Sequence, residues 1–187
     1  MDAGPGSDEI QIDLHALVTY LPNPLGAYLN SLRRELVPDC HLRAHVTILP
    51  PRVLTDGNAG WKRVQQEVID FSPIEIELGE IEVFPVTSVI YLSIKRGRDQ
   101  LIALHDHLAK GVLSYQEPYE YHPHITLAQG LSSEELNAGV DHARRKWRAF
   151  QGTREFTLDS MTFVRSIVKN EWMDLGEVSL GAVRIGS

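Results

Sequence analysis

Hydrophobic and polar positions along this chain follow two different periods. A period of two predicts strands, most clearly over Ile74 to Leu78, where isoleucine and leucine alternate with glutamate. Helical spacing of apolar residues predicts helices over residues 25–36, 61–71, 101–108 and 136–150. In the first of these helices, Arg33 and Arg34 are predicted on the side opposite the apolar stripe.

The predicted elements come in the same order twice: strand, helix, strand, helix, strand. We place the two halves at about residues 10–86 and 87–187, with a closing hairpin of Glu155 to Val164 and Trp172 to Leu180. A repeated unit of this kind predicts one domain, residues 10–187, made of two similar lobes across a groove. Residues 1–9 are expected to be a disordered lead-in.

The second strand of each half carries the same short motif. The first copy is His45-Val46-Thr47-Ile48 and the second is His124-Ile125-Thr126-Leu127, 79 residues later (124 − 45). Alternate side chains of a strand share one face, so each histidine and threonine should lie together while the aliphatic residues face the core. Two imidazoles and two hydroxyls over one patch predict a pocket for a phosphate and for acid–base chemistry.

These motifs resemble those of the 2H phosphoesterases, and more narrowly the 2′-5′ RNA ligase-like family. The resemblance extends over about residues 10–180 and rests on Pro123 to Ala128 and His45 to Pro51. It implies an α+β bilobal duplicated fold with two antiparallel sheets and outer helices around a central groove. It also implies chemistry without a metal or cofactor on 2′,3′-cyclic phosphates or 2′-5′ linkages.

In that family's pattern, the catalytic residues correspond to His45, Thr47, His124 and Thr126. Two histidines can exchange one proton with the nucleophile and one with the leaving oxygen near neutral pH. The threonines would donate hydrogen bonds to phosphate oxygens. The sequence does not assign which histidine is the acid. Many relatives carry a basic residue shortly after the second motif, where this chain has Gln129, so the source of positive charge stays open.

Residues beside the motifs are candidate substrate contacts. Arg43 and Arg52 flank the first motif and could bind phosphate oxygens, or could be solvated surface residues. Tyr119 and Tyr121 precede the second motif and could stack on a base, although packing of the loop is an alternative. His122 could line the rim of the pocket.

Composition limits the partners. The formal net charge of −7 argues against broad binding of long duplex nucleic acid, but it allows a small nucleotide or an RNA end in a local pocket. The single cysteine, Cys40, excludes an intrachain disulfide and a CxxC zinc site. No apolar run approaches the ~18 residues of a membrane span, and the N-terminus has no signal pattern. We expect a cytoplasmic monomer without membrane association.

Two other functions stay open at this point. One is a metal-dependent hydrolase that uses His122, His124 and His45 as ligands. The other is a module that binds nucleotides or RNA ends without turnover. The physiological substrate, and the choice between ligation and hydrolysis, are not determined by the sequence.

Overall fold

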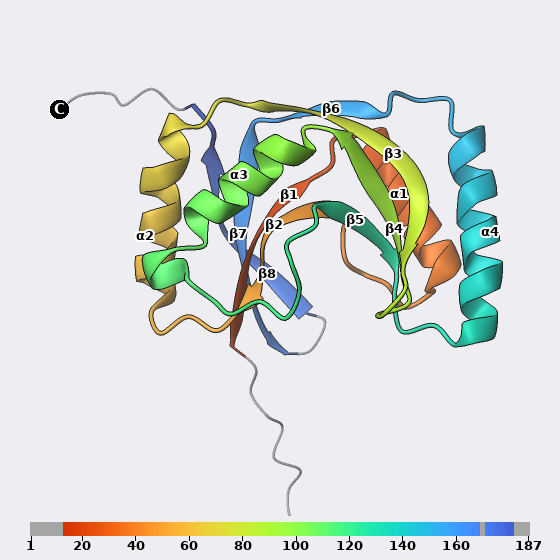
Figure 1. The fold of residues 1–187 in the computed structure, drawn as a ribbon, viewed down its shortest axis with the longest axis horizontal. Coiled ribbons are helices and arrows are strands. Elements are labelled where there is room, and N and C mark those ends of the chain that lie inside the picture. The colour runs from red at the N-terminus through yellow and green to blue at the C-terminus, as the bar shows by residue number, and fades with distance from the viewer. Residues whose placement is uncertain (1–12, 169–170, 182–187) are drawn as a thin grey trace, which may run out of the picture.

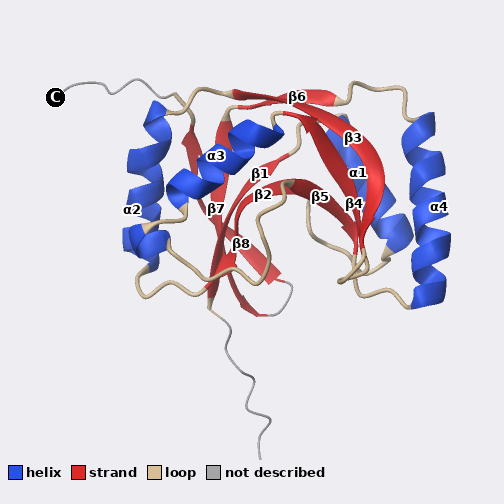
Figure 2. Cartoon of the chain, viewed as in Figure 1, coloured by secondary structure: helices blue, strands red, loops and turns tan. Residues whose placement is uncertain are grey.

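The computed structural model describes residues 13–168 and 171–181, which form eight strands and four α-helices (Figures 1 and 2). The predicted lead-in, residues 1–9, lies outside the described residues. The strands are β1 (Leu14–Tyr20), β2 (His45–Arg52), β3 (Ile74–Phe84), β4 (Val89–Arg96), β5 (His124–Ala128), β6 (Glu155–Leu158), β7 (Ser160–Val168) and β8 (Glu171–Ser179). The helices are α1 (Leu25–Leu36), α2 (Gly57–Glu67), α3 (Arg98–Leu108) and α4 (Ser133–Ala149), with short 3-10 turns η1 (Val68–Asp70) and η2 (Gly111–Leu113).

The strands form two four-stranded antiparallel sheets. The first has the order β2-β1-β7-β8 and the second has the order β5-β4-β3-β6. Each motif strand is therefore the edge strand of its sheet, and the two edges, β2 and β5, contact each other in the centre of the molecule (Figure 1). The α+β fold with two antiparallel sheets is confirmed.

The two sheets do not coincide with the predicted halves, 10–86 and 87–187. Strand β3 belongs to the first half, but it pairs with β4 across a short turn and so joins the second sheet. Strands β7 and β8 belong to the second half, but β7 pairs with β1 in the first sheet. Local hydrophobic alternation marks a strand without specifying its partner, so the sequence pattern does not determine which strands share a sheet.

The predicted closing strand Glu155 to Val164 is in fact two strands in different sheets. β6 pairs with β3, and β7 pairs with β1 and β8. The chain passes from one sheet to the other at Asp159, whose carbonyl accepts a hydrogen bond from the amide of Leu180 at 2.8 Å. The hairpin that closes the chain is formed by β7 and β8 alone.

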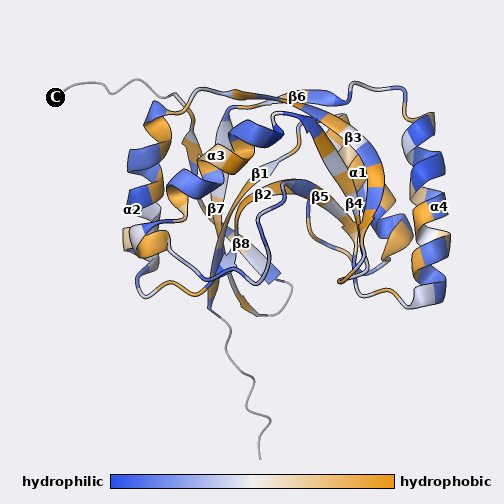
Figure 3. Ribbon diagram, viewed as in Figure 1, coloured by the Kyte–Doolittle hydropathy of each residue, from blue (hydrophilic) through white to orange (hydrophobic). Residues whose placement is uncertain are grey.

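One hydrophobic core joins both sheets. The aliphatic residues inside the two motifs, Val46, Ile48, Ile125 and Leu127, are at most 1% exposed and belong to the same buried cluster. The alternation predicted for β3 is observed, with Ile74, Ile76 and Leu78 buried, and Figure 3 shows it as successive blue and orange segments. The motif histidines and threonines are consequently left on the opposite faces of their strands.

The helices pack across the two halves. α1 follows β1 in the chain but packs against β5 of the second sheet and against α4, while α3 packs against β2 of the first sheet (Figure 1). Helix α4 begins with a capping box, in which Ser132 Oγ accepts from the amide of Glu135 and the Glu135 carboxylate accepts from the amide of Ser132. No helix in residues 13–168 and 171–181 is long and apolar enough to cross a membrane.

Candidate active site

The two motif histidines are held in the same way. His45 Nδ1 lies 2.7 Å from the carbonyl oxygen of Arg43, and His124 Nδ1 lies 2.6 Å from the carbonyl oxygen of His122. A carbonyl oxygen can only accept, so each Nδ1 carries the proton in this bond. Each Nε2 is then a base when the ring is neutral and an acid when the ring is protonated.

A tyrosine on the neighbouring strand lies edge-on to each motif histidine. Tyr20 is paired with His45 across β1 and β2, with ring centroids 6.3 Å apart, and its hydroxyl donates to Asp174 at 2.7 Å. Tyr91 lies 5.5 Å from His124 between centroids, and its hydroxyl donates to Glu82 at 2.8 Å. Burial, and then the hydrogen bond to a carboxylate, raise the pKa of both tyrosines to about 12.

The two tyrosine–carboxylate pairs were not predicted from the sequence. Tyr20 and Tyr91 lie on strands without a motif, and their carboxylates come from a third strand each, β8 for Asp174 and β3 for Glu82. Only the pairing of β1 with β2 and of β4 with β5 places them beside the histidines.

A cavity of about 310 Å³ joins the two motifs. His45 and Thr47 line it from β2, and Thr126 and Gln129 line it from β5 and the residue after it. His124 is not part of this wall, but it lies two residues before Thr126 on the same face of β5. The structure therefore brings together three of the four predicted catalytic side chains around one cavity, with the fourth beside it.

Arg33 also lines this cavity, which corrects its prediction as an outer residue of the first helix. It is 4% exposed, and its Nη2 donates to Cys40 Sγ at 3.4 Å. The other two guanidinium nitrogens, Nε and Nη1, are buried and have no hydrogen-bond partner among the described residues. The sequence pattern indicates only weakly that Arg33 is buried. Arg33 lies at the border of the apolar stripe of α1, between buried Leu32 and exposed Arg34.

The pKa values of both motif histidines are lowered. Burial lowers the pKa of His45 to about 4, opposed by its hydrogen bond to the Arg43 carbonyl and reinforced by the positive charges of Arg33, His124 and Arg43. Burial is also the main cause of the lowered pKa of His124, opposed by its hydrogen bond to the His122 carbonyl and reinforced by the charge of the His122 ring. In the free protein at neutral pH, both rings are therefore mainly uncharged. The permanent positive charge of Arg33 further disfavours protonation of His45.

The two predicted phosphate arginines differ in their surroundings. Arg43 lines the cavity, lies 3.4 Å from the centre of the Tyr20 ring, and forms an ion pair with Asp174 at 2.5 Å. Arg52 is 1% exposed and donates to the carbonyl of Leu113 and to the carboxylate of Glu117, both at 2.7 Å. These bonds occupy the Arg52 guanidinium inside the protein, so Arg52 is a structural residue and the prediction that it contacts phosphate is corrected.

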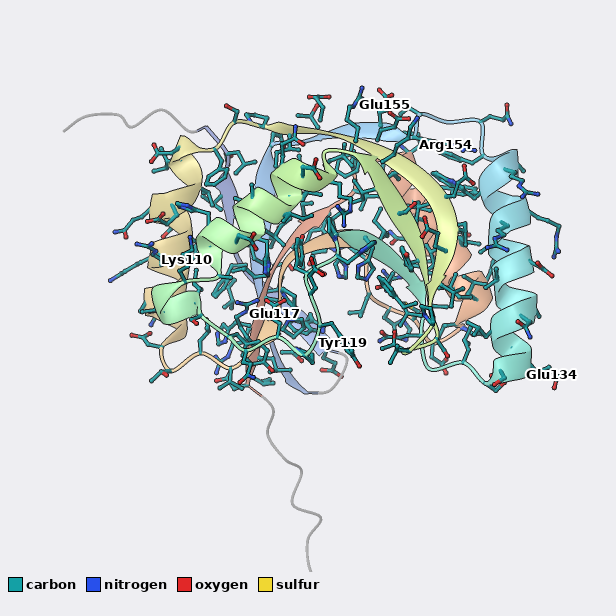
Figure 4. The ribbon with its side chains drawn as sticks, viewed as in Figure 1. Lys110, Glu117, Tyr119, Glu134, Arg154 and Glu155 are labelled. Atoms are coloured by element: carbon teal, nitrogen blue, oxygen red, sulfur yellow. The ribbon has the colours of Figure 1, made fainter. Side chains whose placement is uncertain are left out.

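Tyr121 supports the first motif from behind. Its ring stacks on His105 with centroids 3.9 Å apart, and its hydroxyl donates to the backbone carbonyl of Thr47 at 2.7 Å. Burial raises the pKa of Tyr121, so the hydroxyl stays protonated as the donor. Tyr119, in contrast, is 62% exposed and lies on the same loop as Glu117, in front of the central strands (Figure 4).

His122 lines a different cavity. Its ring lies edge-on to Phe84 at 5.3 Å and to Tyr91 at 5.6 Å, and it borders a larger hollow of about 790 Å³. That hollow extends to Arg154 and Glu155, which lie at the upper edge of Figure 4. Within residues 13–168 and 171–181, no group of three histidine, cysteine or acidic side chains is arranged to hold a metal ion.

The sequence is similar to that of known protein families and proteins. The family model described as the 2′-5′ RNA ligase superfamily matches residues 21–170. A Bacillus licheniformis protein provisionally named a phosphoesterase is 30% identical over 65% of this chain and 73% of its own length. A Halalkalibacterium halodurans protein with the same provisional name is 25% identical over 89% of this chain and 97% of its own.

Solved structures show the same fold. The crystal structure of Escherichia coli LigT complexed with 3′-AMP superposes with a TM-score of 0.62 at 17% identity, over 91% of this chain and 98% of LigT. Kluyveromyces marxianus Usb1 superposes with a TM-score of 0.52 at 10% identity, over 87% of this chain and 97% of Usb1.

Proposed function

The chain belongs to the 2′-5′ RNA ligase superfamily, and from this premise we propose that it is a metal-independent phosphoesterase. Its substrate is a 2′,3′-cyclic phosphate or a 2′-5′ phosphodiester of a nucleotide or RNA end. The observation that carries the proposal is the matched hydrogen bonding of His45 and His124, which leaves one Nε2 on each edge strand for proton transfer.

The lowered pKa values support distinct roles for the two histidines. His45 lies beside Arg33, which disfavours a second positive charge there, so His45 is the neutral general base. No arginine contributes to the shift of His124, so His124 is the group that carries the proton and acts as general acid. A bound phosphate would favour that protonated state by its negative charge.

Hydrolysis of a cyclic phosphate can then be written as a balanced step. His45 Nε2 takes a proton from water while the water oxygen bonds to phosphorus. The bond from phosphorus to one ribose oxygen breaks, and His124 Nε2 gives its proton to that oxygen. The product is a ribose phosphate monoester with the neighbouring hydroxyl restored, and proton transfer between the rings returns them to their starting states.

Thr47 and Thr126 stabilise the charge that builds on the non-bridging oxygens. Both line the cavity, and each lies two residues after its motif histidine on the same strand face. Removal of one such donor typically costs about 10²–10³ in rate. The threonines thus complete a site in which two strands each supply one acid–base group and one hydrogen-bond donor.

A small nucleotide fits this proposal better than a long polymer. The cavity joins two edge strands and is bounded by α1, and the chain carries a net charge of −7. The LigT structures with 3′-AMP, NADP+ and ATP show that a protein of this fold holds such molecules. Short RNA ends remain substrates under the same chemistry, because only the terminal phosphate needs to enter the cavity.

The test is turnover of 2′,3′-cyclic nucleotides, short RNAs ending in a 2′,3′-cyclic phosphate, and 2′-5′-linked dinucleotides, in excess EDTA. Wild type, His45→Ala and His124→Ala are compared, with His41→Ala as control because His41 is an exposed histidine outside the site. We expect turnover in wild type and the control only. Activity that appears only after divalent metal is added would support the metal-dependent hydrolase, and saturable binding without product would support the binding module.

A further inference from the structure

Arg33 is a buried positive charge for which the described residues provide no counter-ion. The other buried arginine, Arg52, is paired with Glu117, and the more exposed Arg43 and Arg165 are paired with Asp174 and Asp13. No carboxylate forms an ion pair with Arg33 in the described ranges, and its Nε and Nη1 have no hydrogen-bond partner there. Buried charges in proteins are normally paired, so this guanidinium requires an explanation.

The cavity beside Arg33 has the composition of an anion site. Its polar wall consists of two arginines, two threonines, one histidine, Tyr20 and Gln129, the rest of the wall is apolar, and no aspartate or glutamate among the described residues lines it. The chain contains 25 acidic residues, and the larger cavity around His122 is lined by four of them, Glu77, Glu80, Glu82 and Glu155. The absence of acids from the smaller cavity is therefore a local feature of that site, and it favours a negatively charged occupant.

The position of Arg33 is fixed from two sides. Asn30, one turn earlier on α1, accepts a hydrogen bond from the amide of Ala44 at 2.6 Å, directly before His45. The Arg33 Nη2 is held by Cys40 at 3.4 Å. Helix α1 is thereby attached to the start of β2, so the guanidinium cannot move away from the first motif without breaking these contacts.

We infer that Arg33 binds the substrate phosphate in this cavity, so that the anion itself is the missing counter-ion. The inference rests on the proposed function for the identity of that anion as a nucleotide phosphate. Arginine from α1 then supplies the positive charge at a site where position 129 carries an uncharged amide. Arg43, which is already paired with Asp174, contributes at the rim.

The experiment measures binding of inorganic phosphate and of 3′-AMP by calorimetry, together with unfolding temperature in phosphate-free buffer. The variants are Arg33→Met, which keeps the length of the side chain without its charge, and Arg33→Lys, which keeps the charge. Arg34→Met is the matched control, because Arg34 is the adjacent arginine on the exposed face of α1.

We expect Arg33→Met to weaken binding of both ligands by about 10- to 100-fold, as for loss of a charge-assisted bond. Arg33→Lys should lose less, and Arg34→Met should bind like wild type. In phosphate-free buffer, Arg33→Met should unfold at the same or a higher temperature than wild type, since an unpaired buried charge has been removed. A residue with only a structural role would show the opposite temperature shift.

The inference is overturned if Arg33→Met binds phosphate and 3′-AMP as wild type does, or if wild type binds neither. If Arg33→Met fails to fold, Arg33→Lys decides: affinity equal to that of Arg34→Met with a lowered unfolding temperature would make Arg33 structural. Turnover is scored separately. Arg33-dependent binding without turnover by wild type would contradict the proposed function alone, and equal turnover and binding by Arg33→Met and wild type would contradict this inference alone.

Discussion

The first and second motif strands are built alike but lie in different electrostatic environments. On each, a histidine Nδ1 bonds the carbonyl two residues earlier, and a tyrosine held by a carboxylate lies beside the ring. Beside His45 of β2, however, lies Arg33, which forms no ion pair with the residues that the structure describes, whereas beside His124 of β5 lie Phe84 and His122. Similar backbone geometry with unequal charge is a way to give two identical side chains separate acid and base roles.

A network of buried and half-buried side chains supports the first motif strand from its far side. Behind β2, Arg52 bonds Glu117, His105 Nδ1 bonds the carbonyl of Ile48 at 2.8 Å, and Tyr121 bonds the carbonyl of Thr47. These contacts join the loop that precedes the second motif to the strand of the first. The loop before the second motif is thus bonded to the first motif strand. Substitutions in this network should therefore disturb the position of β2.

Removal of either motif imidazole should have the largest effect. His45→Ala and His124→Ala are each expected to reduce kcat/KM by about 10²–10⁴, the value of one general acid or base. Far-ultraviolet circular dichroism should be unchanged. The double variant should lose little beyond the more damaging single variant, because the two groups act in one step. Turnover of His45→Ala near the wild-type level would show that the first strand lacks a catalytic role.

Loss of Arg52 should be the main test of stability. Arg52→Met removes the buried arginine partner of Glu117, whose side chain is 14% exposed, and breaking a pair in the interior typically costs about 3–5 kcal/mol. Urea denaturation would measure the change in the free energy of unfolding. The matched control is Arg63→Met, which removes a partly exposed i,i+4 pair with Glu67 and should cost under about 1 kcal/mol. Equal costs for the two variants would contradict the buried network.

The two threonines allow a direct comparison of the strands. Thr47→Val and Thr126→Val keep the shape of the side chain and remove the hydroxyl, so each is expected to lower kcat by about 10²–10³. Similar losses would indicate that both strands contact the phosphate equally. A loss confined to Thr126→Val would indicate that Arg33 already satisfies the oxygen nearest Thr47. Steady-state kinetics with a 2′,3′-cyclic nucleotide would distinguish these results.

The pH profile should reflect the unequal charge. Turnover needs His45 neutral, which holds above about pH 4, and His124 protonated, which fails as pH rises through its lowered pKa. The profile of kcat/KM should therefore be bell-shaped with its optimum below about pH 6.5, and the two apparent values belong to the pair. Arg33→Met should move the acidic limb to higher pH. An acidic limb that does not move would show that Arg33 has no effect on His45.

The same shifts affect stability. A histidine with a lowered pKa in the folded protein binds fewer protons there than in the unfolded chain. The free energy of unfolding should consequently fall as pH decreases from about 6.5 toward about 4, and this fall should be smaller in His45→Gln. Denaturation curves at several pH values would measure it. An equal fall in the variant would contradict the low pKa of His45.

Tyr121→Phe should have the smallest effect. It removes the hydrogen bond to the Thr47 carbonyl but keeps the stack on His105, so a loss of about 0.5–1.5 kcal/mol of stability is expected. Tyr119→Phe, at an exposed position, is the matched control and should change nothing measurable. An unchanged stability in Tyr121→Phe would show that this bond does not support the first motif.

Much of the fold could be predicted from local pattern. The helix bounds of α1, the capping box of α4, the alternation of β3 and the burial of the aliphatic residues in both motifs follow from periods and caps that nearby residues determine. The partner of each strand could not be predicted in this way. Pairing depends on residues far apart in sequence, which is why the pattern did not show that β3 joins the second sheet and that β7 and β8 join the first.

The candidate site also contains residues that the sequence pattern predicted and residues that only tertiary contacts placed there. His45, Thr47, His124 and Thr126 were predictable because each pair recurs at a period of two within an apolar strand, so the chemical groups and their shared face were determined by the sequence itself. The positions of Arg33 and of the tyrosine–carboxylate pairs in the site were determined only by the tertiary structure. A helix from one half packs on the sheet of the other, and the burial and charge of a side chain there depend on contacts that no local pattern contains.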